Sequence, residues 1–330
     1  MSLKQTESKS NPESNPNPNP NPNPNPNPNP NPNPNPDPVL LIYLVYGEDY
    51  ISQLLLQLKT LLRVTPDAPK LYHILLITYD ESRNRIEEDS IKYELIHKFE
   101  HYYLIKTKYS TSIKSFLNNK NKSRIHYIKN KKLFYSYLSS VLLQKLYMFD
   151  WDRIFEYRKV LFLDVDILIN RDLKLLTHNV KKMIENYIYA YSEPYSSHTQ
   201  DEWRVRPYTE KELKMFEKTK INPFNTGTLF FIPTPIMKQH FINMQELIQK
   251  NRDIIYHYDQ SVFNHYFNLK KLSKTKLMDN LVKTYPDSLT EYKDPVLLHF
   301  VGIGESEHKM RLMINYYNKF FNQTFGQQHA

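Results

Sequence analysis

The sequence predicts an α/β protein in which helices flank a mixed, mostly parallel β-sheet. Short apolar runs rich in strand-forming residues alternate with segments of helical spacing, and this alternation is typical of βαβ units. The chain has 330 residues, enough for one large α/β domain. Because no linker or repeat interrupts the sequence after residue 38, we predict a single folded domain.

The first 38 residues are predicted to lie outside this domain. Residues 15–36 consist of eleven consecutive Asn-Pro pairs, which offer no apolar side chains to bury. Such a segment is typical of disordered or polyproline-like chain. It could be a spacer or interaction arm, or an expanded repeat without function. We place the folded domain at 39–316 and a C-terminal tail at 317–330.

The elements of the domain follow from the hydrophobic pattern. In the first half, we predict strands at 39–46, 71–79 and 100–106, and helices at 48–63, 83–98 and 134–149. In the second half, we predict strands at 187–192, 228–232 and 296–301, and helices at 234–249 and 259–267. The long polar segment 195–222 receives no predicted element.

Composition narrows the chemistry. The chain contains no cysteine, which excludes disulfides, thiolate metal sites and cysteine nucleophiles. The formal net charge of +9 is compatible with an anionic partner such as a nucleotide, an acidic glycan or a membrane surface. The dense basic run 120–132 either makes such a contact or is a solvated loop. Because we find no signal-peptide core and no apolar run of ~20 residues, we expect a soluble, cytoplasmic protein without a membrane span.

Two carboxylates interrupt the most apolar strand. In RKVLFLDVDILINRDL, residues 158–173, Asp164 and Asp166 lie between apolar residues, and burying an unpaired carboxylate costs several kcal/mol. Side chains two apart on a strand point the same way, so the two would converge and repel unless a proton or cation lay between them. The pattern therefore indicates Mg²⁺ or Mn²⁺ shared with phosphate oxygens. A pair of solvated aspartates at a strand end is the alternative.

Other common enzyme motifs are missing. The sequence contains no P-loop, no HExxH and no GxSxG, which argues against the corresponding nucleotidases, metalloproteases and hydrolases. Gly302-Ile303-Gly304 begins a dinucleotide-binding pattern, but Glu307 stands where its last glycine would be.

Several motifs together resemble the family-8 glycosyltransferases, the glycogenin and galactinol synthase group. LIYLVYGEDYISQLLLQLKTL (41–61) is similar to that family's opening strand and helix, and VLFLDVDILI (160–169) to its DxD strand. PFNTGTLFF (223–231), YDQSVFNHYF (258–267) and LLHFVG (297–302) follow in the family's order. The resemblance implies a single GT-A type nucleotide-diphospho-sugar transferase domain, here the catalytic domain at 39–316.

The resemblance implies a metal centre. Asp164, Asp166 and His299 would bind the cation, which is usually Mn²⁺ in this family, and Mg²⁺ stays open. Gly302, from HFVG, would lie against the diphosphate.

The resemblance also implies donor contacts. Leu44, Tyr46 and Tyr50 match the uridine-binding turn after the first strand, although ordinary core packing would also explain the two tyrosines. Lys145 matches a basic donor contact, and Val165 lies between the two aspartates of the DxD motif.

Further positions match residues around the sugar. Asn225 and Thr226 would face the sugar, and Asp259 and Gln260 would lie near the reacting carbon as the catalytic pair. Glu193, in a loose alignment, matches an acidic donor contact.

The sequence departs from the family pattern in two places. The family follows HFxG with Lys-Pro-Trp, whose lysine binds the diphosphate, whereas here Glu305 stands near that position and Lys309 is displaced. A carboxylate beside a diphosphate is unfavourable, so either Lys309 reaches back or the phosphate is held more weakly. The segment 195–222 is also long, and an acceptor site, a lid and mere decoration are all open for it.

The expected activity is retaining, metal-dependent transfer of a hexose from UDP-glucose or UDP-galactose to a protein or glycan hydroxyl. Asp259 would act as the nucleophile of a double displacement or as a stabilising group in same-face attack. Tyr285 is a weak candidate for self-glycosylation, a homodimer is open, and no nucleic-acid partner is expected. The alternatives are a catalytically degenerate module that binds UDP-sugar or glycan and a Mg²⁺-dependent nucleotidyl- or phosphotransferase.

Overall fold

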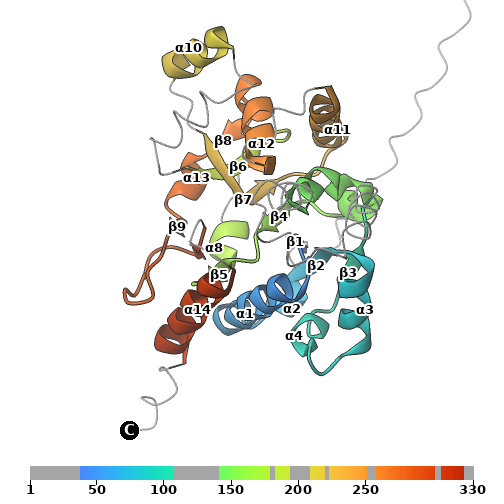
Figure 1. Cartoon of the computed structure of the whole chain (residues 1–330), viewed down its shortest axis with the longest axis vertical. Helices are drawn as coiled ribbons and strands as arrows, with labels where there is room; N and C mark the ends of the chain where they lie inside the picture. The colour runs from blue at the N-terminus through green and yellow to red at the C-terminus, as the bar shows by residue number, and fades with distance from the viewer. Residues whose placement is uncertain are drawn as a thin grey trace, which may run out of the picture. The chain divides into compact units, whose positions relative to one another are not determined.

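The computed structural model describes residues 38–107, 141–178, 183–193, 209–219, 223–250, 258–301 and 306–322. Its main feature is a seven-stranded sheet of order β3-β2-β1-β4-β7-β6-β8 (Figure 1). Six of these strands run in the same direction and β7 runs against its neighbours β4 and β6. The predicted mixed, mostly parallel α/β architecture is therefore confirmed.

The strands divide between two sheets. The large sheet contains β1 (Val39–Leu44), β2 (Tyr72–Ile77), β3 (Tyr102–Ile105), β4 (Val160–Leu163), β6 (Ile188–Ser192), β7 (Phe224–Phe231) and β8 (Ser273–Lys274). A three-stranded sheet contains β5 (Ile167–Ile169), β10 (Leu297–His299) and β9 (Val282–Thr284). Since β4 and β5 are adjacent in sequence, the short segment between them joins the two sheets.

Helices cover both faces of the large sheet. The α-helices are α1 (Glu48–Val64), α2 (Ala68–Leu71), α3 (Asp80–Glu88), α4 (Glu94–His97), α8 (Lys174–Thr177), α10 (Glu210–Thr219), α11 (Pro235–Lys250), α12 (Tyr258–Leu269), α13 (Lys276–Asp279) and α14 (Ser306–Tyr316). Two 3₁₀ helices, η2 (Leu143–Asp150) and η3 (Asp152–Glu156), precede β4, and the π-helix η5 (Tyr317–Phe321) follows α14.

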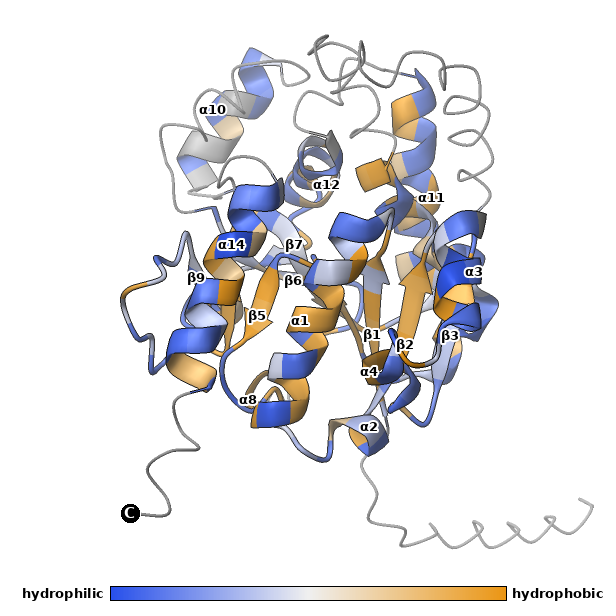
Figure 2. Cartoon of the chain, turned by 60° about the horizontal axis from the view of Figure 1, so that its bottom comes forward, coloured by the Kyte–Doolittle hydropathy of each residue, from blue (hydrophilic) through white to orange (hydrophobic). Residues whose placement is uncertain are grey.

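The core lies on the two sides of the sheet, as the alternation of a strand requires. On β1, Leu41 and Tyr43 pack into a cluster with α1 and α4, whereas Leu40 and Ile42 pack into a second cluster with η2, α11 and α12. Figure 2 shows the apolar strands β1, β2 and β5 and the largely apolar helix α1, whereas α3 and α14 mix hydrophilic and hydrophobic residues. Each fully buried aliphatic side chain contributes about 1.5–3 kcal/mol, and the two clusters fix the strands whose ends carry the polar site.

The helix predicted at 83–98 is wrong as one element, because it is interrupted between α3 and α4. The Asp89 side chain accepts a hydrogen bond of 2.8 Å from the Lys92 backbone N–H. Such local side-chain bonds compete with a helix, and the chain turns there. The helix predicted at 134–149 is described only from residue 141, and from Leu143 it is the 3₁₀ helix η2 rather than an α-helix.

The single strand predicted through Asp164 and Asp166 is also wrong. β4 ends at Leu163 and β5 begins at Ile167, and the aspartates lie in the turn between the two sheets. The Asp164 N–H donates to the Gly227 carbonyl at 2.7 Å, which ties the start of this segment to β7 of the large sheet. The aspartates therefore meet through a turn and not through strand alternation.

Several elements escaped the sequence pattern. α10 lies within the polar segment 195–222, and α13, α14 and the short strands β8 and β9 were not predicted. η5 lies in the predicted C-terminal tail, where Tyr317 and Phe321 are buried. The domain boundaries remain a prediction. Among the described residues, no helix combines the length and apolarity that crossing a membrane requires.

Candidate active site

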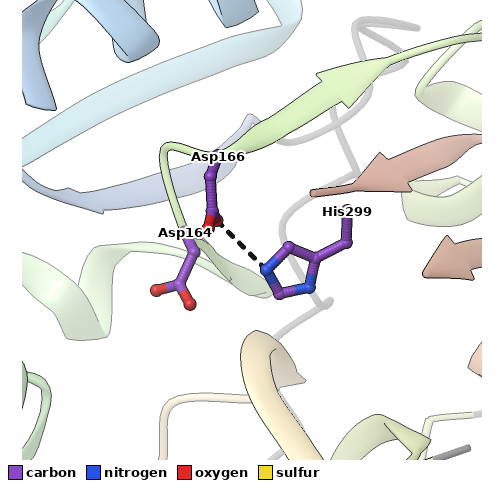
Figure 3. Close-up of side chains that lie close together, drawn as sticks. All are labelled: Asp164, Asp166 and His299. Carbon is purple, nitrogen blue, oxygen red and sulfur yellow. Dashed lines mark ion pairs between the residues drawn. The ribbon is translucent and has the colours of Figure 1, made fainter. Parts of the chain in front are cut away.

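The candidate site lies at the edge of the large sheet where β4 ends and β7 begins. Ligands of open α/β sheets bind at the carboxyl ends of parallel strands. Here the turn after β4 supplies Asp164 and Asp166, and the end of β10 supplies His299 (Figure 3). One ligand atom from each of these three residues lies within 4.8 Å of the other two.

Asp166 and His299 face each other without a hydrogen bond. His299 Nε2 lies 3.1 Å from Asp166 Oδ1, yet both atoms are buried and neither makes a hydrogen bond. Buried polar atoms are almost always hydrogen-bonded, so each exception needs an explanation. A cation bound next to both atoms would supply the partner that each lacks.

Lys309 reaches this pair from α14. Its Nζ lies 2.6 Å from Asp166 Oδ2, and its side chain is 19% exposed. Burial opposes ionisation of Asp166, but the charges of Lys309 and His299 outweigh it and hold the pKa of Asp166 far below its ordinary value. The displaced lysine of the sequence therefore reaches back to the site.

A second lysine lies under the other aspartate. Lys145 on η2 is 1% exposed, and its Nζ lies 3.1 Å from Asp164 Oδ1 and 2.9 Å from Asp259 Oδ2. Burial lowers the pKa of Lys145, but the two carboxylates raise it above the ordinary value overall. Burial raises the pKa of Asp164, against the opposing effect of Lys145. Lys145 thus joins the DxD turn to helix α12.

β7 forms the floor of the site. Thr226 donates from Oγ1 to Asp259 Oδ2 at 2.7 Å, and its carbonyl accepts from Lys145 Nζ at 3.1 Å. A Cβ added to Gly227 would lie 2.2 Å from His299 Cε1 and 2.8 Å from Asp164 Oδ2. Only glycine leaves room there, because such distances are far inside van der Waals contact.

The remaining predicted sugar contacts lie beside β7. Asn225 Nδ2 donates to Glu193 Oε2 at 3.1 Å, and Gln260 Nε2 lies 3.5 Å from the same oxygen. Asn264 on α12 bonds both the N–H and the carbonyl of Phe224, at 2.8 and 2.7 Å. These bonds fix α12 against the start of β7, and Asp259 and Gln260 lie on the first turn of that helix.

Comparison with known proteins identifies the family. A family model described as "Glycosyl transferase family 8" matches residues 42–305. The chain belongs to glycosyltransferase family 8. It is therefore a glycosyltransferase, as the resemblance predicted. A search of curated proteins found no match.

Solved structures share the fold of this family-8 glycosyltransferase. The galactosyltransferase LgtC, solved with donor and acceptor sugar analogues, is 14% identical, with a TM-score of 0.53 over 83% of this chain and 95% of that chain. The apo bifunctional glycosyltransferase WbbM is 13% identical, with a TM-score of 0.51 over 87% of this chain and 51% of that chain. Apo GlyE from Streptococcus pneumoniae TIGR4 is 13% identical, with a TM-score of 0.51 over 87% of this chain and 64% of that chain. At these identities the likeness establishes the GT-A fold and nothing finer.

Of the residues predicted to bind the uridine, Leu44 and Tyr46 are buried and Tyr50 is partly buried. Leu44 ends β1, and Tyr46 stacks on Tyr79 with ring centroids 5.5 Å apart. Tyr50 is partly buried against the α1 side of the core. The side chain of Val165 is buried in that same cluster. Their contacts with a donor remain a prediction.

Two predicted positions of the family-8 glycosyltransferase, Gly302 and Glu305, lie outside the described residues. Tyr285 is described: its N–H donates to the His299 carbonyl at 3.0 Å, and its φ of 50° is unusual for a residue other than glycine.

The sequence pattern missed two residues of the site. Gly227 lies within the PFNTGTLFF motif, and an isolated glycine inside a strand can signal a close approach of another group. Tyr191 on β6 has its hydroxyl 2.5 Å from His299 Nδ1, and no sequence signal distinguished it among the 26 tyrosines of the chain.

Proposed function

We propose that this glycosyltransferase moves a hexose from UDP-glucose or UDP-galactose to a protein or glycan hydroxyl, with retention of the anomeric configuration and with a divalent cation. One observation carries the proposal: Asp164, Asp166 and His299 bring their ligand atoms within 4.8 Å of one another, and two of those buried atoms face each other without a hydrogen bond.

The donor set fits the cation. Two carboxylates and one imidazole suit Mn²⁺, while Mg²⁺ prefers oxygen ligands alone. When bound, the cation would neutralise the negative charge that develops on the departing diphosphate. Lys309, 2.6 Å from Asp166, supplies a further positive charge at the same place.

The chain's own residues define the face that the sugar meets. Asp259 Oδ2 is in contact with both the Lys145 ammonium and the Thr226 hydroxyl, at 2.9 and 2.7 Å. An oxygen with two such partners is a weak nucleophile, because its charge is already neutralised. This favours same-face attack, in which the leaving phosphate takes the acceptor proton and Asp259 holds Lys145 and Thr226 in position.

UDP release from a panel of UDP-sugars, with and without Mn²⁺, tests the proposal. We expect one hexose donor to turn over, and Asp166→Asn to lower the rate about 100-fold or more because a ligand is lost. Asp152→Asn is the control, since Asp152 pairs with Lys238 at the surface. NMR of the product would report its anomeric configuration.

The acceptor is tested in the same samples. Tyr285 lies next to the strand that carries His299, which is compatible with transfer to the chain itself. Mass spectrometry of the intact protein would then show added hexose that Tyr285→Phe abolishes. If UDP-sugar and Mn²⁺ bind but no donor turns over with any glycan or protein acceptor, the chain is a binding module and the proposal of catalysis is wrong.

A further inference from the structure

His299 has a second nitrogen, and its contact has no assigned role. Nδ1, on the side of the ring away from Asp166, lies 2.5 Å from the hydroxyl of Tyr191. The two rings are perpendicular, with centroids 5.9 Å apart. Tyr191 belongs to β6 of the large sheet and His299 to β10 of the small sheet, so this contact joins the two sheets at the site.

The chemistry of imidazole gives this contact a consequence. A neutral histidine carries one N–H, so Nε2 can offer a lone pair to a cation only when the proton is on Nδ1. That N–H then needs an acceptor, because a buried donor without a partner is costly. Tyr191 and His299 are only 2% and 1% exposed, which leaves little access for water. In the part of the chain that the structure describes, the Tyr191 hydroxyl is the group placed to accept.

We propose that Tyr191 is a positioning residue for the metal centre. Its hydroxyl oxygen accepts the Nδ1–H of His299 and so holds Nε2 as a ligand directed at the position shared with Asp164 and Asp166. This role rests on the proposed metal-dependent function and adds to it the residue that sets the tautomer and the orientation of the imidazole.

The surroundings of the ring support this role. Gly227 on β7 lies directly against the imidazole ring of His299, since a Cβ at residue 227 would lie 2.2 Å from His299 Cε1. The hydrogen bond to Tyr191 then fixes how the imidazole ring of His299 is rotated within this narrow space. A hydroxyl both donates and accepts, so the same contact also serves the other tautomer of His299 in protein without a cation. A carboxylate at residue 191 would lack this property and would add a third buried charge beside Asp164 and Asp166.

The test compares two tyrosines of one strand. Tyr189, also on β6 and buried, uses its hydroxyl to accept a hydrogen bond of 2.8 Å from the Ile184 N–H, away from the site. Titration calorimetry would measure the Kd for Mn²⁺ of the full chain, its Tyr191→Phe variant and its Tyr189→Phe variant. We expect Tyr191→Phe to weaken Mn²⁺ binding about 10-fold or more, as loss of an outer partner of a metal-binding histidine does. Tyr189→Phe should leave the Kd unchanged.

A structural role and a positioning role give different results. The melting temperature of each protein without cation reports the structural cost of losing either hydroxyl, and the shift on adding Mn²⁺ reports the positioning effect. If Tyr191→Phe binds Mn²⁺ as tightly as the wild type, the role of Tyr191 is overturned while the metal centre stands. If the wild type binds no Mn²⁺, the proposed metal dependence itself fails, and the two outcomes cannot be confused.

A measurement on the unmodified protein gives an independent answer. Nitrogen-15 NMR of the imidazoles distinguishes the two tautomers, and His299→Ala would assign the signal. In the presence of Zn²⁺, a diamagnetic cation that binds imidazole, we expect the proton of His299 on Nδ1. A proton found on Nε2 under saturating Zn²⁺ would overturn the proposal, even if Tyr191→Phe fails to fold.

Discussion

Titratable side chains gather at both ends of the large sheet, where His73 is partly buried and His101 exposed at one end, and Asp166 and His299 are buried at the other. Where β2 and β3 begin, His73 Nδ1 is 2.7 Å from the Tyr157 hydroxyl, and the His73 ring lies 4.3 Å from that of His101. Where β4 ends, Asp166 and His299 face each other at 3.1 Å with buried atoms that make no hydrogen bond. In the first cluster His73 and Tyr157 pair with each other, whereas in the second two facing atoms make no hydrogen bond.

Comparing the His73 cluster with the Asp166–His299 pair indicates which observation identifies a binding site. Both ends contain strongly shifted groups: burial, and then the charge of His101, lower the pKa of His73 to about 4, and the pKa of Asp166 is also far below its ordinary value. A shifted pKa is therefore a weak indicator by itself. The binding end is distinguished from the packing end by two buried atoms without a hydrogen bond that face each other at 3.1 Å, because a single buried atom without a hydrogen bond, His178 Nε2, also lies beside Tyr72 at the start of β2. The predictions that follow test this distinction.

Lys145→Met should have the largest effect. It would leave Asp164 and Asp259 buried without their cation, which costs about 3–5 kcal/mol, and a displaced DxD turn would lower UDP release about 100-fold. Denaturant unfolding and the release assay measure the two effects. Lys238→Met is the control, because Lys238 pairs with Asp152 at the surface and such pairs contribute about 1 kcal/mol or less. Equal destabilisation by both variants would contradict the role given to Lys145.

Gly227→Ala should act on the metal centre more than on stability. The new methyl group must displace His299 or Asp164, at a cost of about 1–3 kcal/mol for overpacking, and we expect Mn²⁺ binding to fall about 10-fold or more. Gly47→Ala provides the contrast: a Cβ there meets nothing within 4 Å, but the φ of +87° is strained for alanine. Calorimetry should show weaker Mn²⁺ binding for the first variant alone. Unchanged binding by Gly227→Ala would show that the ring has more room than the structure indicates.

Lys309→Met should have a smaller effect with the opposite sign. Because Lys309 contacts the same carboxylate that a cation would use, its removal should tighten binding of Mn²⁺ alone severalfold. The affinity for UDP should fall, since a positive charge beside the diphosphate is lost. Lys319→Met on η5, where the lysine only donates to the Leu289 carbonyl, should change neither value. If Lys309→Met weakens Mn²⁺ binding, the lysine supports the centre and does not compete with the cation.

The sequence supplied the residues of the site but not their local geometry. The structure brings ligand atoms of Asp164, Asp166 and His299 within 4.8 Å of one another, and their role as metal ligands stays a prediction. The turn between the two aspartates was missed because Val165 and Ile167 continue the apolar pattern of β4, and such a run looks the same whether or not the strand breaks within it. The contact of Tyr191 with His299 was also missed.

Physical reasons account for these limits. Tyr191 and His299 are 108 positions apart on different sheets, and no periodicity connects two such residues. α10 and α14 were missed because charged residues stand between the apolar ones in their sequences, KELKMFEK and EHKMRLMI. Residue types that carry chemistry can thus be predicted from one sequence, whereas contacts between distant strands require the fold.

The smallest effect should appear at the packing end. Because the folded state holds the pKa of His73 at about 4, below its ordinary value of 6.5, the unfolded chain binds more protons between these values. Stability from this group is therefore fully present above about pH 6.5 and is lost as the pH falls towards 4. His73→Gln does not titrate, so its melting temperature should fall less between pH 7 and 4.5 than that of the wild type, while Mn²⁺ affinity at pH 7.5 stays the same. His308→Gln, at an exposed position of α14, should retain the wild-type slope. If His73→Gln instead weakened Mn²⁺ binding, the two ends of the sheet would be coupled and the separation between packing and binding would be wrong.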